Sequence, residues 1–285
     1  MTEWVIDRNL IRRKEFDRYK ENLEDSFILT DTFFVEAIKN HDSWKETLCQ
    51  DLKALMTVRA RTRMARSVSK VLRIEKEQRR AVTRDEWFSP ELQTLLDRLF
   101  CAVSRGGDDY NRMIQQIQDI LPDVRSEQST ADRSKERYTS IVDELRCNLD
   151  NHDLSALRGG LIPKDAELGL VVLITQSAYD AVNAANGKLL PIQTKSATAR
   201  FMLLTVLRGV SWVKKGGLDG AKGSSLHNDD YDNEYIVVGS YFNGTLTNDT
   251  RAKEAEENLM RIISSASETD LVTAFQDYKR KNLKL

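Results

Sequence analysis

The 285 residues suffice for one large domain or two small ones, and the 31% of charged residues is high beside 40% of hydrophobic residues. A formal net charge of −1 gives the whole molecule no electrostatic preference for nucleic acid, so any basic binding surface has to be local. Three widely spaced cysteines without a CxxC pair argue against a zinc knuckle and against a disulfide framework.

The beginning of the chain, MTEWVIDRNLIRRKEF, is charged and lacks the apolar segment of a signal peptide. The longest apolar run, at residues 170–174, is far too short to span a bilayer. We therefore expect a cytoplasmic protein with no membrane segment.

The first predicted strand is a short β-favouring run, SFILT at 26–30, which ends at Asp31. Helical periodicity follows it. Apolar and small residues then alternate with arginine in TVRARTRMAR at 57–66, and this period of two favours a second strand. Ser67 or Ser69 is expected to cap the next helix, and Ser89 followed by Pro90 is expected to begin a later one.

From residue 85 onward, the chain is predicted to be mostly helical. Helical spacing dominates residues 85–150, and two apolar segments at 164–186 and 195–214 have the pattern of core helices. A helix at 228–242 ends at a glycine, and the short strand 245–247 follows it.

Strands separated by helices predict an α/β fold with a parallel sheet that has helices on both faces. The expected organisation has three parts. Residues 1–25 form a helical extension, residues 26–84 and 156–285 form the α/β core, and residues 85–155 form a large helical insertion or lid.

Acidic residues follow the predicted strands. Asp31 and Asp249 each come at a strand end, and the carboxyl ends of parallel strands meet at one edge of a sheet. Glu75 lies on the expected inner side of the second helix, and Asp229 and Asp232 share a face at the expected start of a later helix. Phosphodiester cleavage needs an activated water and neutralisation of developing charge, and a divalent metal held by carboxylates supplies both. For each single aspartate, helix capping is the alternative explanation.

The segments ILTDTFF, SKVLRIE and NDDYDNEYIVVGSYFNGTLTND together resemble PIN-domain nucleases. That family has an aspartate after its first strand, a glutamate in the next helix, an aspartate that opens a later helix, and a strand ending in T-x-D. The matching positions are Asp31, Glu75, Asp229 or Asp232, and Asp249.

The resemblance implies a PIN-like core and a metal-dependent endoribonuclease that uses Mg²⁺ or Mn²⁺ and leaves a 3′-hydroxyl and a 5′-phosphate. It also implies a toxin or defence effector with a regulatory protein partner, while self-association stays open. The implied catalytic residues and metal ligands are Asp31, Glu75, Asp232 and Asp249, with Asp229 as an accessory ligand and Thr247 or Asn248 orienting a carboxylate.

A basic segment surrounds Glu75. Between residues 51 and 80 the chain has ten lysines or arginines against three acidic residues. Such a segment can supply phosphate contacts to RNA or to another single-stranded nucleic acid, although a solvated charged surface gives the same pattern. The expected contacts are Arg59, Arg61, Arg63, Arg66, Lys70 and Arg73.

Two other functions stay open from the sequence. Arg146 and His152, with five residues between them, resemble the motif of HEPN ribonucleases, which are helical and do not use metal. An inactive PIN-like scaffold that binds RNA or a protein partner is the other alternative. The absence of GxxxxGK[ST], GxGxxG and GxSxG motifs argues against nucleotide-dependent transfer and against a serine hydrolase.

Overall fold

The structure is a computed structural model that describes residues 2–38, 43–120, 127–185, 195–265 and 268–282. Its internal contacts divide the chain into two compact units. Unit 1 consists of Met1–Glu77, Val82–Ser129 and Glu234–Lys253. Unit 2 consists of Gln78–Ala81, Thr130–Asn233 and Glu254–Leu285.

Unit 1 contains the sheet. Its strands are β1 (Thr2–Ile6), β2 (Asp25–Leu29), β3 (Thr62–Met64) and β4 (Thr245–Leu246). Its helical elements are η1 (Arg8–Leu10), α1 (Lys14–Glu21), α2 (Asp31–Ile38), α3 (Trp44–Leu55), η2 (Met56–Arg61), α4 (Val68–Gln78, whose last residue falls in unit 2), η3 (Asp85–Trp87), α5 (Pro90–Arg105) and α6 (Gly107–Ile120).

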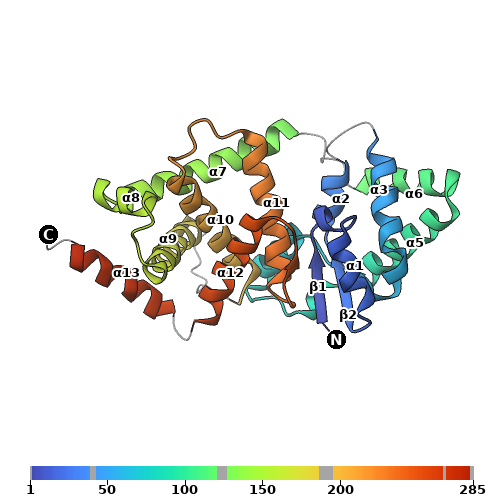
Figure 1. Ribbon diagram of the computed structural model, residues 1–285, viewed down its shortest axis with the longest axis horizontal. Helices are drawn as coiled ribbons and strands as arrows, with labels where there is room; N and C mark the ends of the chain where they lie inside the picture. Colours follow the sequence, from blue (N-terminus) through green and yellow to red (C-terminus); the bar gives the residue numbers. More distant parts are fainter. Residues whose placement is uncertain (1, 39–42, 121–126, 186–194, 266–267, 283–285) are drawn as a thin grey trace. The chain divides into compact units, whose positions relative to one another are not determined.

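All neighbouring strands of the four-stranded sheet are parallel, in the order β3-β2-β1-β4. Val5 of β1 pairs with Ile28 on one side and with Thr245 on the other, and Figure 1 shows β1 and β2 side by side. Every residue of β2 is buried, as is typical of parallel sheets covered on both faces. The predicted α/β fold with a parallel sheet is therefore confirmed.

The prediction of a helical extension at residues 1–25 is wrong at its start. Thr2–Ile6 form β1, the strand that lies between β2 and β4. Val5 and Ile6 are fully buried, so this short apolar run outweighs the charged residues around it. The predicted strands at 26–30 and 245–247 are present as β2 and β4, whereas only Thr62–Met64 of the predicted strand 57–66 are extended.

The order of the strands reverses at β1. The chain steps from β1 to β2 and on to β3 at one edge, and then returns as β4 on the other side of β1. Most of unit 2 lies in the connection between β3 and β4. In open parallel sheets, ligands bind outside the carboxyl ends of the strands at such a reversal, which here falls between β1 and β4.

Serine residues cap two helices of unit 1, as the sequence predicts. The Ser67 hydroxyl accepts from the Lys70 amide at 3.1 Å at the start of α4. The Ser89 hydroxyl accepts from the Leu92 amide at 3.3 Å, and Pro90 follows as the first residue of α5. Both caps satisfy amides that the first turn of a helix leaves without partners.

Unit 2 is helical. The expected insertion at 85–155 is divided between the units, and residues 121–126 lie outside the described residues. None of the helices in the described part of the chain is long and apolar enough to cross a membrane. The helices are α7 (Glu127–Asn148), α8 (Asn151–Arg158), α9 (Lys164–Ala185), α10 (Ala197–Lys214), α11 (Gly223–Gly239), α12 (Thr250–Ser264) and α13 (Glu268–Asn282), of which α7, α11 and α12 also contribute residues to unit 1.

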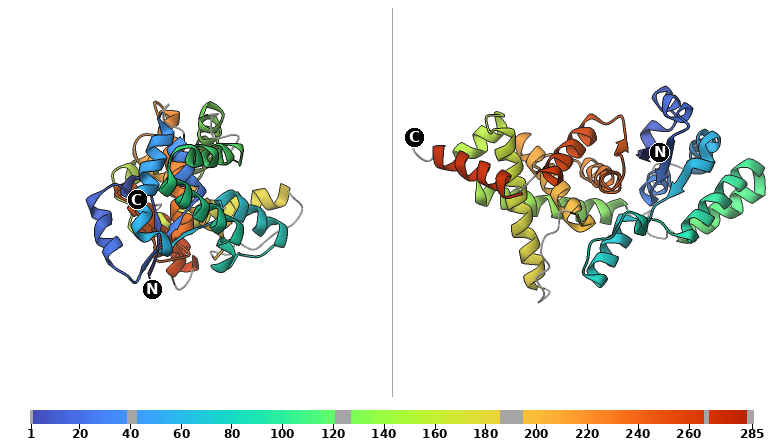
Figure 2. Two further views of the ribbon diagram at one scale, coloured as in Figure 1. Left: turned by 90° about the vertical axis from the view of Figure 1, so that its right-hand side faces the viewer. Right: turned by 90° about the horizontal axis from the view of Figure 1, so that it is seen from below.

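The packing of α13 on α9 depends on a glycine. In the right-hand view of Figure 2, α13 lies against α9, and the two helices are in contact. A Cβ atom added to Gly169 of α9 would overlap the backbone carbonyl of Leu271 in α13. Because backbone cannot move aside as a side chain can, only glycine permits this approach.

We expect Gly169→Ala to lower the free energy of unfolding by at least about 1–3 kcal/mol, the usual cost of overpacking. Urea denaturation followed by circular dichroism measures the change. Gly159→Ala is the matched control, because Gly159 has an ordinary φ of −77° and ends a helix of the same unit. Equal stability of the two variants would contradict the close approach of α13 to α9.

Candidate active site

Asp7 follows β1 directly and is 2% exposed. Its carboxylate accepts from the Asn9 amide at 2.9 Å and from the Thr247 hydroxyl at 2.5 Å. The Thr247 oxygen in turn accepts from the Asp249 amide at 3.0 Å. Thr247 therefore joins the carboxyl ends of β1 and β4 and holds two aspartates beside the reversal point of the sheet.

Asp249 caps a helix with one of its oxygens. Its Oδ1 accepts from the amides of Arg251 and Ala252 at 2.7 and 3.1 Å, at the start of α12. The Oδ2 atom lies 3.9 Å from the Arg251 guanidinium, and the side chain is 33% exposed. Helix capping therefore accounts for the Oδ1 atom of Asp249, while the Oδ2 atom stays available to a ligand.

Asp31 comes two residues after the end of β2 and begins α2. Its Oδ1 atom is buried without a hydrogen-bond partner, as is the hydroxyl of the neighbouring Thr30. Burial raises the pKa of Asp31 from 3.8 to about 6, although backbone amides partly oppose the shift. A carboxylate oxygen left in this state is costly unless a proton or a cation reaches it.

Two glutamates that the sequence analysis did not single out complete the group. Glu234 accepts from the Thr32 hydroxyl at 2.5 Å, and Glu36 accepts from the Tyr235 hydroxyl at 2.8 Å. Burial raises the pKa of Tyr235, and the charges of Glu36 and Asp7 raise it further. We call this set the acidic edge. It consists of Asp7, Asp31, Glu36, Glu234 and Asp249, all in unit 1.

The acidic edge concentrates negative charge in a poorly solvated place. Burial raises the pKa of Asp7, even though Thr247 and Asn9 donate hydrogen bonds to its carboxylate. The charge of Asp249 raises that pKa further. Like charges that share a dry site favour protons or a cation, and a divalent cation removes the conflict without protonation.

The acidic edge fits Mg²⁺ or Mn²⁺ chemically, because its donors are all oxygens and the Asp31 Oδ1 atom has no other partner. Its ligand atoms do not form a compact group, however. Among the residues described, only Asp150, His152 and Asp153 bring three ligand atoms within 4.8 Å of one another. Holding a cation at the acidic edge therefore requires its side chains to turn toward one another.

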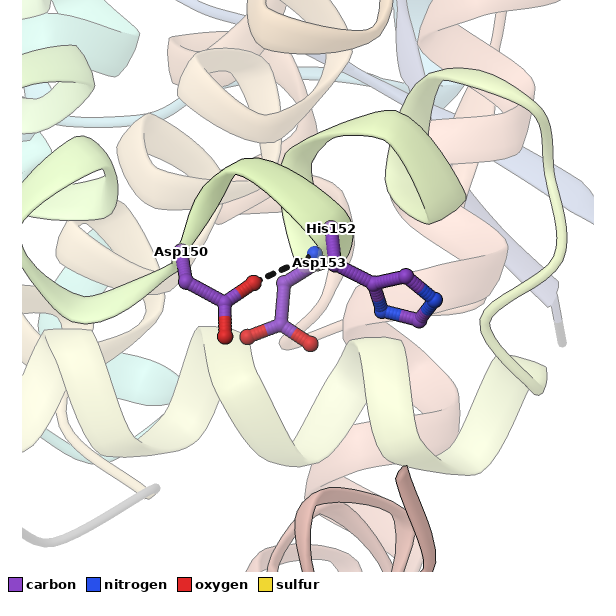
Figure 3. A group of neighbouring side chains, drawn as sticks. All are labelled: Asp150, His152 and Asp153. Carbon is purple, nitrogen blue, oxygen red and sulfur yellow. Dashed lines mark hydrogen bonds between the residues drawn. The ribbon is translucent and has the colours of Figure 1, made fainter. Parts of the chain in front are cut away.

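The Asp150, His152 and Asp153 group has a structural explanation. Figure 3 shows the two carboxylates together at the start of α8, where Asp150 accepts from the Asp153 amide at 2.8 Å. The Lys279 ammonium pairs with buried Asp153 and lies 3.9 Å from Asp150. Lys279 already supplies a positive charge to these carboxylates, so a metal ion would have to displace it.

Glu75 is buried in α4, at 5% exposure, and accepts from the Val82 amide at 3.0 Å. At about 1.5 Å per residue, it lies roughly 10 Å along the helix from its start. Its observed hydrogen bond holds the chain that leaves α4. Glu75 does point inward as expected, but its hydrogen bond with Val82 stabilises the fold and does not indicate a metal ligand.

Asp229 and Asp232 were expected in the first turn of a helix, and this expectation is wrong because α11 begins at Gly223. Their described contacts lie within unit 2. Arg208, 4% exposed, is 3.1 Å from Asp232 and 3.7 Å from Asp229, and the Trp212 indole donates to Asp229 at 2.9 Å. These aspartates form a mostly buried network with one arginine.

Half of the basic residues predicted to contact nucleic acid have structural contacts. Arg61 donates to three backbone carbonyls near the start of β2, including that of Asp25. Arg63 stacks on the Phe88 ring at 3.4 Å, and Arg66 donates to the carbonyl of Glu86 at 3.1 Å. The remaining three side chains are exposed, as is Asn248 beside the acidic edge. These three are Arg59, Lys70 and Arg73.

Comparison with known proteins adds no relative. No protein-family model matches the chain, and neither a curated protein nor a solved structure gives a significant match.

We expect Arg208→Met to lower the free energy of unfolding by about 3–5 kcal/mol, because it leaves buried carboxylates without their cation. Urea denaturation measures the loss. Arg280→Met is the matched control, since Arg280 is 72% exposed and its ion pair with Asp277 should contribute less than about 1 kcal/mol. A loss for Arg208→Met as small as for the control would show that the network is not formed.

The raised pKa of Asp31 predicts a pH-dependent effect of Asp31→Asn in protein freed of divalent metal by EDTA. Between pH 3.8 and about 6 the folded protein binds more protons at Asp31 than the unfolded chain, so this residue lowers stability as the pH rises. The variant should be more stable than wild type at pH 7, by about 1–2 kcal/mol after allowance for partial exposure, and the gain should shrink toward pH 4. Thermal denaturation across this range measures it. A gain that does not depend on pH would contradict the assignment.

Proposed function

We propose that the chain is a cytoplasmic, metal-dependent nuclease that cuts phosphodiester bonds of RNA at the acidic edge. The observation that supports this proposal most is the parallel order of β2, β1 and β4. It brings Asp31, Asp7 and Asp249, which are distant in sequence, to neighbouring carboxyl ends of one sheet. This is the position at which open parallel sheets bind ligands.

Asp7, Asp31 and Asp249 would hold the cation, with Glu36 and Glu234 next to them. When bound there, Mg²⁺ or Mn²⁺ would supply positive charge to the phosphate and would make a water molecule easier to deprotonate. Both metals prefer oxygen ligands, which is the only kind that the acidic edge offers.

Hydroxyl groups orient these carboxylates. Thr247 donates to Asp7, Thr32 donates to Glu234 and Tyr235 donates to Glu36. Such donors fix the direction of a carboxylate before substrate arrives, and their loss in metal sites typically reduces affinity or activity about 10–100-fold. The hydrogen bond to Asp7 thus supports the expected role of Thr247 in orienting a carboxylate.

Two features support the resemblance to PIN-domain nucleases. The aspartate that follows the first strand is Asp7, not Asp31 as the sequence suggested, and the T-x-D segment stands directly after β4. Glu75 and Asp232 give no such support, because their described contacts are structural. Exposed Lys70 and Arg73 on α4 could contact the phosphates of RNA.

The test is cleavage of a labelled single-stranded RNA with Mn²⁺ or Mg²⁺. Wild type should cut, EDTA should abolish cutting, and Asp7→Asn or Asp249→Asn should reduce the rate at least about 100-fold, since each removes a metal-binding carboxylate. Asparagine keeps the size and one acceptor oxygen of aspartate, so the fold should survive. Asp277→Asn, at a half-exposed side chain on α13, is the control and should cut like wild type.

Other outcomes point elsewhere. Cleavage that resists EDTA but disappears in His152→Ala would replace this proposal with a metal-independent helical ribonuclease. Tight RNA binding by folded protein that never cuts would favour a scaffold.

A further inference from the structure

A pocket of about 450 Å³ lies within unit 1, at the carboxyl ends of β2 and β3. Its wall includes Asp31 of the acidic edge, together with Ala65 and Arg66, which follow β3. The volume is in the range of sites that hold small organic groups. The pocket therefore adjoins the proposed active site and has room for one part of a substrate.

Much of the pocket wall is apolar. Leu92, Leu95 and Leu99 of α5 are spaced by three and four residues, so they share one helix face. Phe34 of α2 and Met64 of β3 complete the apolar part. Such a surface favours a flat, weakly polar group such as a nucleobase, which it can cover and stack upon.

The rest of the lining favours an anion. Arg66, which uses its Nε atom to donate to the Glu86 carbonyl, and exposed Lys70 lie at the start of α4, and Ser89 caps α5. The N-termini of both helices add partial positive charge. The lining has one further carboxylate, Glu91, whose pKa is lowered by the 2.6 Å hydrogen bond from the Ser89 hydroxyl and by the charge of Arg66. The apolar wall therefore suits the base of a nucleotide, and the basic residues at the start of α4 suit its phosphate.

We propose that this pocket takes the base of an unpaired nucleotide in the strand that is cut, with an adjacent phosphate against Arg66 and Lys70. The proposal rests on the nuclease function of the acidic edge and specifies its substrate as single-stranded. A base must leave its stack to enter a pocket, which costs least where the strand is unpaired.

The experiment measures binding separately from cutting. Protein carrying Asp249→Asn is titrated into a single-stranded RNA decamer with 2-aminopurine at its centre, and into the same decamer in a duplex. The single strand should change fluorescence on binding, and the duplex should bind at least about tenfold more weakly. In the same background, Leu95→Trp, which fills the pocket, should weaken single-strand binding at least about tenfold.

Leu161→Trp, at a leucine that is 75% exposed in unit 2, is the control and should bind unchanged. Lys70→Glu, at an exposed site, keeps the test decisive if Leu95→Trp fails to fold, and it should reduce affinity and the salt dependence of binding. Unchanged affinity in folded Leu95→Trp or in Lys70→Glu, or equal binding of duplex, would overturn the proposal. The binding experiment needs no cutting, so it tests the pocket separately from the nuclease function. If single-strand binding depends on the pocket but wild type never cleaves RNA, only the nuclease function is rejected.

Discussion

The carboxyl ends of β2, β1 and β4 are neighbours because the three strands pair in parallel with β1 in the middle. Everything proposed for this protein depends on that pairing. The hydrogen bond from Thr247 to Asp7 joins the ends of β4 and β1, although the two residues are 240 positions apart in sequence. The Asp249 amide donates to the same Thr247 hydroxyl, which places a second aspartate next to Asp7. Without β1 between its two neighbours, the three aspartates would be unrelated helix caps. With it, they surround the point where the strand order reverses, which is where a parallel sheet offers room for a ligand.

By itself, the acidic edge lowers the stability of the folded protein. Burial removes water from Asp7 and Asp31, which disfavours their ionised forms and therefore raises the pKa of both carboxyl groups. Elsewhere, the chain balances buried acids with cations, as Arg208 does for Asp229 and Asp232, and as Lys279 does for Asp153. At the acidic edge, Arg251 lies 3.9 Å from Asp249, and hydroxyl and amide groups donate to the other carboxylates, but one buried oxygen of Asp31 has no partner. That buried oxygen is the physical reason to expect an external cation there.

Local patterns predicted the parts of this structure that local interactions decide. The runs before Asp31 and Asp249 gave β2 and β4, and the serine caps of α4 and α5 followed from the sequence. β1 was missed because five residues inside a charged segment carry little periodic signal, and Asp7 was missed with it. The clue was present, since WVID has the same apolar run ending in aspartate as the other strands. The partners of Asp229, Asp232 and Glu75 could not be predicted, because tertiary packing selects them from other elements.

Binding of Mn²⁺, followed by electron paramagnetic resonance of the free ion, shows whether the acidic edge holds a metal. Wild type, Asp7→Asn and Asp150→Asn would be titrated side by side, because they separate the acidic edge from the only compact ligand group found among the described residues. We predict that wild type binds Mn²⁺, that Asp7→Asn weakens binding at least about tenfold, and that Asp150→Asn does not change it. Binding that survives in Asp7→Asn but disappears in Asp150→Asn, or no binding by wild type, would show that the acidic edge is not a metal site.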